Sequence, residues 1–327
     1  MPEKTYTFLP TVAEFPDDVE ASWELQKPLA DKGYCPGFMV FCRKGILGLS
    51  DTELTKKRYD NLAKYADIYN APVIVMLNNL PVEDIDTLSN GAKASEHIER
   101  GVEFASALPI GKRKAVTFHL NSLVSQDEFF SKTQQEWYEL FQESISKRLR
   151  TAAEFAKNKG IGLLVESVPV PEFGDLADSE LSRLRNPFYM FSGNLPYNEI
   201  ISDGLGICLD LCHSRTIYGQ AQSAEEGIMF DEDKRAIKEK RLSLLEDVSS
   251  LVPARDIVHF NDGKGRYTSR GGVFYEGLVP GEGEIENMPE ITKTLLERKL
   301  PLVIEVAETD FKGRPNTKRA INFLLRV

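Results

Sequence analysis

The sequence lacks an uninterrupted apolar run of the roughly 18 or more residues that a membrane-spanning helix needs. Its N-terminus also lacks a basic segment followed by an apolar core, so no secretion signal is expected. Basic residues are in the minority, with 40 Lys and Arg against 50 Asp and Glu. These absences predict a soluble, cytoplasmic protein with no membrane partner, and they make a nucleic-acid partner unlikely, because nucleic acids call for a basic surface.

Cysteine and histidine are both scarce, with four of each in 327 residues. The cysteines lie in apolar, strand-like settings and are too few for a disulfide framework, so we expect buried thiols. Cys208 and Cys212 have the spacing CxxxC, but they flank a strand end, and we do not expect them to bind a metal. His97 falls within a predicted helix and is expected on the surface.

Short apolar runs alternate with longer amphipathic segments, which is the pattern of repeated strand–helix units around a parallel sheet. The predicted strands are mostly continuous in apolar residues, as strands covered on both faces are. They comprise residues 6–9, 37–42, 72–77, 115–120, 161–168, 205–211, 256–260 and 302–306. An open doubly wound sheet is the alternative, but no glycine-rich phosphate-binding motif follows the first strand.

Helices are predicted between these strands, and Lys159-Gly160 supplies a glycine C-cap directly before the fifth strand. A capping box at residues 50–53 opens one helix. The helices comprise residues 18–30, 50–69, 92–107, 134–158, 231–251, 287–299 and 316–325. Without a linker or short repeat, we predict one domain over residues 1–327, a (β/α)8 barrel of the α/β class. Insertions at about residues 169–203 and 263–283, in the loops after strands 5 and 7, would lie on its catalytic face.

Ionisable residues recur where the predicted strands end. They are His119, Glu166, Asp210, His259 and Glu305. In a closed barrel the carboxyl ends of all strands reach one mouth, so these side chains should converge. Each taken alone could end its strand facing solvent, but repetition on successive strands makes that reading weak. Three carboxylates in one place repel each other unless a cation neutralises them, and we therefore predict one divalent metal ion.

The motifs around these positions resemble those of the xylose-isomerase-like barrel superfamily. They are Leu-Val-Glu-Ser at Glu166, Cys-Leu-Asp-Leu-Cys-His from Cys208 to His213, Val-His-Phe-Asn-Asp at His259, the turn from Pro280 to Ile285, and Val-Ile-Glu at Glu305. That superfamily contains the ketose 3-epimerases, the inosose dehydratases and endonuclease IV. The resemblance spans about residues 114 to 327, and the first third of the chain matches only in its rhythm of strands and helices.

For the epimerases and isomerases, the resemblance implies that Glu166, Asp210, His259 and Glu305 bind one metal ion. It also implies that Glu166 and Glu305 flank the reacting carbon as catalytic acid and base. Three carboxylates and one imidazole suit Mn, Mg or Co more than Zn, although Zn is possible.

The three-zinc cluster of endonuclease IV is only partly matched. His119 and His213 correspond to ligands of that cluster, but the third-strand histidine is missing from residues 76–79. An expected Asp-x-His is replaced by Tyr275-Glu276-Gly277. We expect His213 to approach from the loop after the sixth strand, as a residue that contacts substrate or orients a ligand rather than as a ligand itself.

These observations predict a metal-dependent sugar isomerase or epimerase that forms an enediolate from a keto-sugar or polyol. A dehydratase or related lyase, an endonuclease IV-like phosphodiesterase and a metal-free binding subunit are the alternatives. We expect His119, His213, Lys264 and Arg266 to contact the substrate, and Lys264, Arg266 and Arg270 to bind an anionic group if it carries one. The segment 188–191 could wall the pocket or pack as a satellite cluster. A homo-oligomer is possible.

Overall fold

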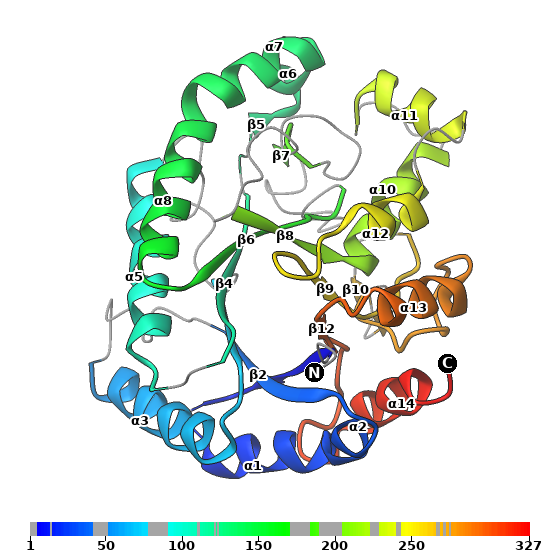
Figure 1. The fold of residues 1–327 in the computed structure, drawn as a ribbon. Coiled ribbons are helices and arrows are strands. Elements are labelled where there is room, and N and C mark those ends of the chain that lie inside the picture. The colour runs from blue at the N-terminus through cyan, green and yellow to red at the C-terminus, as the bar shows by residue number, and fades with distance from the viewer. Residues whose placement is uncertain are drawn as a thin grey trace.

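Eight parallel strands form a closed barrel in the computed structural model (Figure 1). The structure describes residues 5–13, 15–41, 52–77, 91–109, 112–120, 122, 124–170, 184–189, 205–222, 229–239, 243–265, 269–270, 273–274 and 276–327. The barrel strands are β1 (Tyr6–Thr11), β2 (Cys35–Phe41), β3 (Val73–Met76), β4 (Lys114–His119), β6 (Gly162–Glu166), β8 (Leu205–Asp210), β9 (Ile257–His259) and β12 (Leu302–Val303). Each overlaps a predicted strand, so the predicted fold class is confirmed.

The barrel closes because β1 pairs with β2 on one side and with β12 on the other, in both cases in parallel. One buried cluster takes at least one residue from every barrel strand and fills the interior, as the packed centre of such a barrel does. Its members are Phe8, Met39, Ile74, Met76, Ala115, Leu164, Cys208, Ile257 and Val303. The interior beneath the mouth is therefore mainly apolar.

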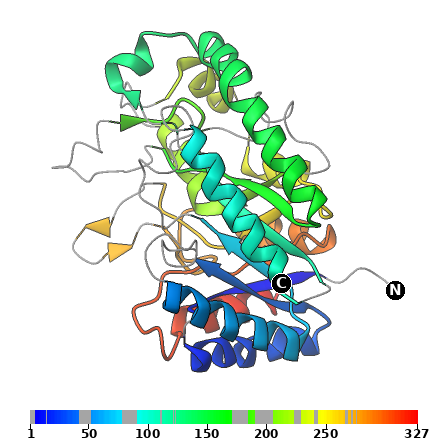
Figure 2. The same ribbon diagram turned by 90° about the vertical axis from the view of Figure 1, so that its left-hand side faces the viewer.

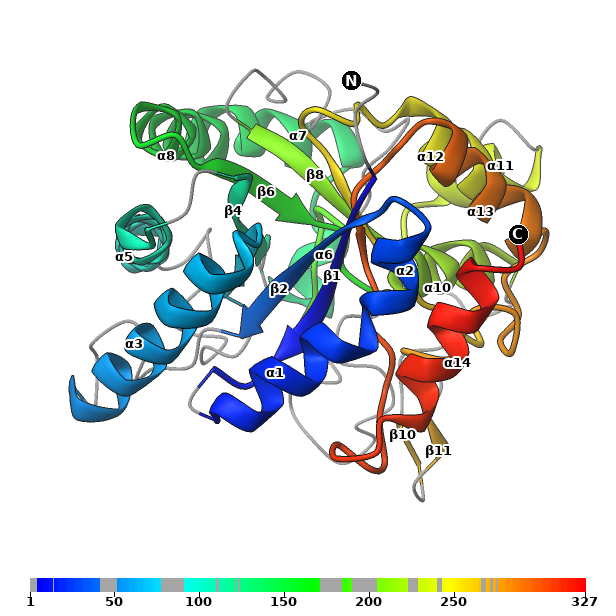
Figure 3. The same ribbon diagram turned by 60° about the horizontal axis from the view of Figure 1, so that its bottom comes forward.

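Helices surround the barrel (Figure 1 and Figure 3). They are α1 (Pro16–Leu25), α2 (Lys27–Asp31), α3 (Thr52–Tyr69), α5 (Gly91–Ala107), α7 (Gln134–Leu140), α8 (Lys147–Asn158), α10 (Leu211–Gln222), α11 (Asp231–Lys238), α12 (Leu244–Ser250), α13 (Met288–Glu297) and α14 (Pro315–Leu324). The short helix α6 (Gln126–Phe130) lies by the strand pair β5 (Val124–Ser125) and β7 (Leu184–Arg185). A second pair, β10 (Ser269–Arg270) and β11 (Val273–Phe274), projects from the barrel (Figure 2).

Three predicted helices are interrupted. The segment 18–30 divides at Gln26, where Pro28 lies in the first turn of α2 and has no amide hydrogen to continue the helix. A π-helical turn, η1 (Phe141–Ser146), separates α7 from α8, and α11 and α12 divide the segment 231–251. Gly160 ends α8 with φ of +69°, which confirms the predicted cap. Residues 50 and 51 of the predicted capping box lie outside the described residues.

The predicted surface position of His97 is wrong, because its side chain is only 1% exposed. Helix α5 buries Ala94, Ile98, Gly101 and Val102 on one face, and position 97 belongs to that face. A helical period of 3.6 residues therefore determines its burial, whatever its polarity.

The prediction of buried thiols is confirmed for two of the three described cysteines. Cys208 and Cys212 are buried free thiols and Cys35 is partly exposed, while Cys42 lies outside the described residues. Within the described part of the chain, no helix has the length and apolar character needed to cross a membrane.

Candidate active site

The strand register places the predicted residues side by side at one edge of the barrel. His119 at the end of β4 lies opposite Glu166 on β6, and Asp210 on β8 lies opposite His259 on β9. Val303 of β12 pairs with His259, and Glu305 follows two residues later. Parallel strands end at the same edge, so residues far apart in the sequence meet there.

Glu166, Asp210, His259 and Glu305 converge on one point, with ligand atoms all within 4.8 Å of one another. The Nδ1 atom of His259 lies at the centre. It is 2.7 Å from Glu305 Oε2, 3.2 Å from Glu166 Oε1 and 3.4 Å from Asp210 Oδ2. Glu166, Asp210 and His259 are buried, whereas the side chain of Glu305 is 24% exposed. The site is thus open on the Glu305 side.

Asp210 joins a strand to a helix and is fixed at both ends. Its amide donates to Ser167 Oγ at 2.8 Å, and its Oδ1 accepts the amide hydrogen of His213 at 2.9 Å in the first turn of α10. This is the bond that an N-capping aspartate makes. Its Oδ2 accepts from Asn261 Nδ2 at 3.1 Å, and Asn261 Oδ1 in turn accepts the Cys212 amide hydrogen. Asn261 was not predicted, although it lies in the same Val-His-Phe-Asn-Asp motif.

Asp262 organises the segment that leaves β9, and sequence reasoning also missed it. Its buried carboxylate accepts four backbone amide hydrogens. The donors are Gly263 at 2.7 Å, Gly281 at 2.9 Å, Gly283 at 3.1 Å and Ile285 at 3.1 Å. A Cβ atom on Gly283 would lie 2.2 Å from Asp262 Oδ1, so this glycine permits the close approach. Asp262, at the start of the insertion after β9, is therefore hydrogen-bonded to the Pro280–Ile285 turn at its end, which holds the two ends together.

The charges of these groups depend on one another. Burial raises the pKa of Glu166, but the His259 and His119 imidazoles outweigh it and hold that pKa well below its usual value. Burial also opposes ionisation of Asp210, yet His213 and His259 lower its pKa to about 2. Burial lowers the pKa of His259, but the neighbouring acidic groups, Cys208, Glu166 and Glu305, outweigh it and raise that pKa well above its usual value. Without a metal ion, the charges of Glu166, Asp210 and His259 therefore stabilise one another.

The residues present fit a divalent cation. Three of the four groups offer carboxylate oxygens, which hard cations prefer. Within the described residues, His259 Nδ1, His259 Nε2 and Glu305 Oε2 are buried without a well-aligned hydrogen bond. Buried polar atoms in that condition cost free energy unless another partner satisfies them, and a metal ion would do so for His259 Nδ1 and Glu305 Oε2.

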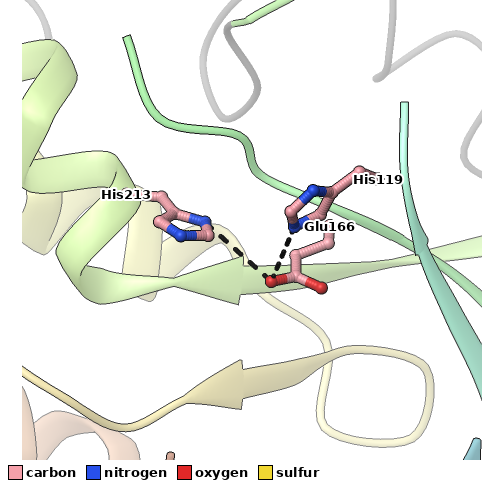
Figure 4. A group of neighbouring side chains, drawn as sticks. All are labelled: His119, Glu166 and His213. Atoms are coloured by element: carbon pink, nitrogen blue, oxygen red, sulfur yellow. Dashed lines mark ion pairs between the residues drawn. The ribbon is translucent and has the colours of Figure 1, made fainter. Parts of the chain in front are cut away.

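His119 and His213 flank Glu166 from two directions (Figure 4). His119 Nε2 is 3.2 Å and His213 Nδ1 is 3.9 Å from Glu166 Oε1. His213 Nδ1 also lies 2.8 Å from the Ser167 carbonyl oxygen, which as an acceptor favours a proton on that nitrogen. Burial lowers the pKa of His213, but Asp210, Glu276 and Glu166 together raise it to about 10. The predicted loop position of His213 is wrong, because α10 begins directly after β8.

The remaining predicted contacts are placed less closely. Lys264 is partly exposed and lies two residues beyond Asp262. Arg266 and the side chain of Arg270 lie outside the described residues, as do Met190 and Phe191. Phe188 and Tyr189 are buried in a packing cluster, where Phe188 contacts Trp137 and Phe141 and Tyr189 donates to Asp233.

One acidic residue near the site was not predicted as functional. Glu276, in the stretch where the endonuclease IV pattern fails, places Oε2 3.7 Å from His213 Nε2. The sequence offered no signal for it, because the contact depends on how the long segment after β9 returns to the mouth.

Comparison with known proteins gives one family and a set of solved structures. The sequence profile of the xylose isomerase-like TIM barrel family matches residues 29–327. Comparison with curated protein sequences gives no match. A D-tagatose 3-epimerase-like protein has 19% identity and a TM-score of 0.54, with 97% of each chain covered. The D-allulose 3-epimerase of Methylomonas sp. has 12% identity and a TM-score of 0.60, covering 99% of this chain and 98% of that one.

A third solved structure contains a metal ion. It is a xylose isomerase-like TIM barrel protein from Mycobacterium smegmatis in complex with magnesium, with 12% identity and a TM-score of 0.52. The alignment covers 95% of this chain and 87% of that one. At these identities the likeness to the solved structures shows a shared fold.

Proposed function

The chain belongs to the xylose isomerase-like TIM barrel family, and on that premise we propose that it is a divalent-metal-dependent isomerase or epimerase acting on a keto-sugar or polyol. The carrying observation is the position of Glu166 and Glu305, whose carboxylates lie 3.2 and 2.7 Å from the same atom, His259 Nδ1. Two carboxylates beside one cation site can serve the two proton transfers that such a reaction needs.

We assign Glu166, Asp210, His259 and Glu305 to one divalent ion, with Mn, Mg or Co favoured by the oxygen-rich donors. When bound, the ion would polarise a substrate carbonyl and lower the pKa of the neighbouring C–H group. One of Glu166 and Glu305 removes that proton, and the other returns a proton to the resulting enediolate. His119 and His213 lie beside Glu166, where they can orient substrate hydroxyl groups.

Loss of a hydroxyl from the same enediolate would make the enzyme a dehydratase or related lyase. A second candidate, an endonuclease IV-like phosphodiesterase, is favoured by one observation, which is that both His119 and His213 face Glu166. The incomplete ligand pattern and the net charge of −10 oppose it. Metal analysis of the purified protein discriminates here, because about one ion per chain would not support a three-metal nuclease, and no ion would favour the metal-free binding subunit.

The decisive experiment is solvent exchange. With Mn2+ and a substrate in heavy water, deuterium should enter the carbon beside the carbonyl, and loss of either Glu166 or Glu305 should stop the exchange. The panel should contain free ketoses, inososes, keto-sugars derived from glycosides, and sugar phosphates. Hydrolysis needs no exchange of carbon-bound hydrogen. If no compound exchanges while an abasic-site duplex is cut, the nuclease assignment replaces ours.

A further inference from the structure

Glu276 is an acidic residue at the mouth that the proposed chemistry does not use. Its Oε2 faces His213 Nε2 at 3.7 Å, and its side chain is 38% exposed. The other ring nitrogen of His213 faces inward, where Nδ1 lies 3.9 Å from both Glu166 Oε1 and Asp210 Oδ2. One imidazole ring therefore separates Glu276 from the four converging groups. A substrate bound at those groups would extend past the His213 ring toward Glu276.

The backbone around Glu276 is fixed to the two strand ends that carry His259 and Glu305. Leu278 exchanges two hydrogen bonds with Asp262, at 2.8 and 2.9 Å. The Gly277 carbonyl accepts the Ala307 amide hydrogen at 2.7 Å. Gly277 has φ of +61°, which a residue with a side chain rarely adopts. The position of Glu276 over the site is thus built into the fold.

The Glu276 carboxylate beside the His213 ring disfavours a second anionic group there. Arg215, which follows His213 on α10, donates to the Glu284 carbonyl and lies 3.8 Å from the Glu284 carboxylate. Arg319 pairs with Glu282 on the turn that follows. These two arginines are therefore already engaged by acidic residues. A phosphate group seated by His213 would meet the Glu276 carboxylate within a few ångströms.

We propose that Glu276 is a specificity-determining residue, which accepts hydrogen bonds from substrate hydroxyl groups beyond the reacting carbons and excludes substrates that carry a phosphate or carboxylate there. This inference deepens the proposed function and rests on it. It gives the opposite expectation to an anion site at Lys264 and Arg266, so the two can be separated by experiment.

The test is calorimetric binding to the Mn2+-loaded protein of three probes, D-fructose, D-fructose 6-phosphate and inorganic phosphate. Wild type, Glu276→Gln and Glu282→Gln are compared. Glu282 is a matched control, because it lies on the same segment, has a side chain that is 43% exposed and pairs with Arg319. We expect Glu276→Gln to bind both phosphate probes about tenfold more tightly, as removal of one charge at several ångströms in a partly exposed site predicts. It should bind D-fructose more weakly, and Glu282→Gln should behave as wild type.

Equal changes in Glu276→Gln and Glu282→Gln overturn the proposal. So does a wild type that prefers the phosphate ester and loses that preference in Lys264→Ala or Arg266→Ala. If no variant binds either sugar, the proposed function fails, whereas the inorganic phosphate measurement still decides the role of Glu276. Unchanged thermal unfolding of Glu276→Gln shows that the fold is preserved.

Discussion

Two arcs of the barrel differ in what their strands bring to the mouth. Each strand of the ligand arc, made of β4, β6, β8, β9 and β12, ends in a carboxylate or imidazole residue or carries one within two residues of its end. These residues are His119, Glu166, Asp210, His259 and Glu305. The apolar arc, made of β1, β2 and β3, ends in Thr11, Phe41 and Met76. Because every strand in a barrel reaches the same mouth, this contrast is a property of the sequence, and it confines the proposed chemistry to one side.

The two arcs also differ in what their burial costs. The apolar arc buries side chains such as Phe38 and Val75, which stabilise the fold by leaving water. The ligand arc buries Glu166, Asp210 and His259, whose charges are costly to desolvate and must be balanced by each other or by a cation. We therefore expect substitutions in the ligand arc to alter function first, and substitutions in the apolar arc to alter stability alone.

The largest effect on the site is expected from Glu305→Gln. The change keeps the side-chain volume but removes one carboxylate from the cation site and one candidate acid–base group. Turnover should fall by about a hundredfold to ten-thousandfold, the usual contribution of general acid–base catalysis. The metal-free protein should still fold, at a lower unfolding temperature, because His259 loses the carboxylate 2.7 Å from its Nδ1 atom. Steady-state kinetics and thermal unfolding measure the two.

Glu297→Gln is the control, since Glu297 is an exposed residue paired with Lys293 on α13. It should retain wild-type turnover. Wild-type activity in Glu305→Gln would show that Glu305 does not belong to the site.

The next largest effect concerns metal affinity. Asp210→Ala and His259→Ala each remove one group from the converging set and should weaken Mn2+ binding by about a hundredfold or more, since even residues that only support a ligand cost ten- to a hundredfold. The matched control is Asp60→Ala, an exposed carboxylate on α3 that pairs with Lys56 beside the apolar arc. Calorimetric titration with Mn2+ measures all three. Equal affinities across them would contradict the four-residue assignment.

The sequence predicted the barrel and the members of the converging set for the same reason. Continuous apolar runs mark strands buried on both faces, and a charged residue that ends such a run must face the mouth. Prediction from the sequence was wrong or incomplete where a residue's position depends on contacts in the folded structure. His97 lies on the buried face of α5 although it is polar, and α10 begins directly after β8, where the sequence pattern predicts a loop around His213. Glu276 meets His213 through a long insertion whose path no local pattern encodes.

A smaller effect is expected from pH. The pKa of His259 is raised in the metal-free cluster, so its imidazole holds a proton at neutral pH that a metal ligand cannot keep. Mn2+ binding should release about one proton near neutral pH, and affinity should rise by up to about tenfold per pH unit below that pKa. Calorimetry in two buffers of different ionisation enthalpy measures the proton. Uptake, or no transfer, would place His259 outside the ligand set.

The stability of the metal-free protein should depend on pH in the opposite direction to its affinity for Mn2+. A raised imidazole pKa stabilises the metal-free fold below the unfolded value of about 6.5, and that stabilisation is lost as pH rises through the folded value. His213 should lose its stabilising contribution as pH rises from about 6.5 to its folded pKa of about 10. The metal-free protein should therefore unfold at lower temperature as pH is raised across this window.

The smallest effect on the site is expected from the apolar arc, and a matched pair of substitutions defines it. Phe38 on β2 and Phe260 after β9 are both fully buried; Phe38 contacts Trp23 and Tyr69, and Phe260 contacts Phe323. Replacing either by alanine leaves a cavity of similar size and should cost about 3–5 kcal/mol of unfolding free energy.

The two cavities should differ in their effect on Mn2+ binding. Phe260 directly follows His259, and its amide donates to the Val303 carbonyl at 2.6 Å, so a cavity there loosens the strand that presents the central imidazole. Phe38 has no such connection to the converging groups. Phe260→Ala should therefore weaken Mn2+ affinity several-fold, while Phe38→Ala should leave it within about twofold, because sites without shared partners act nearly independently. Denaturant unfolding and calorimetric titration give both quantities, and an equal loss of affinity in the two variants would show that the arcs act as one unit.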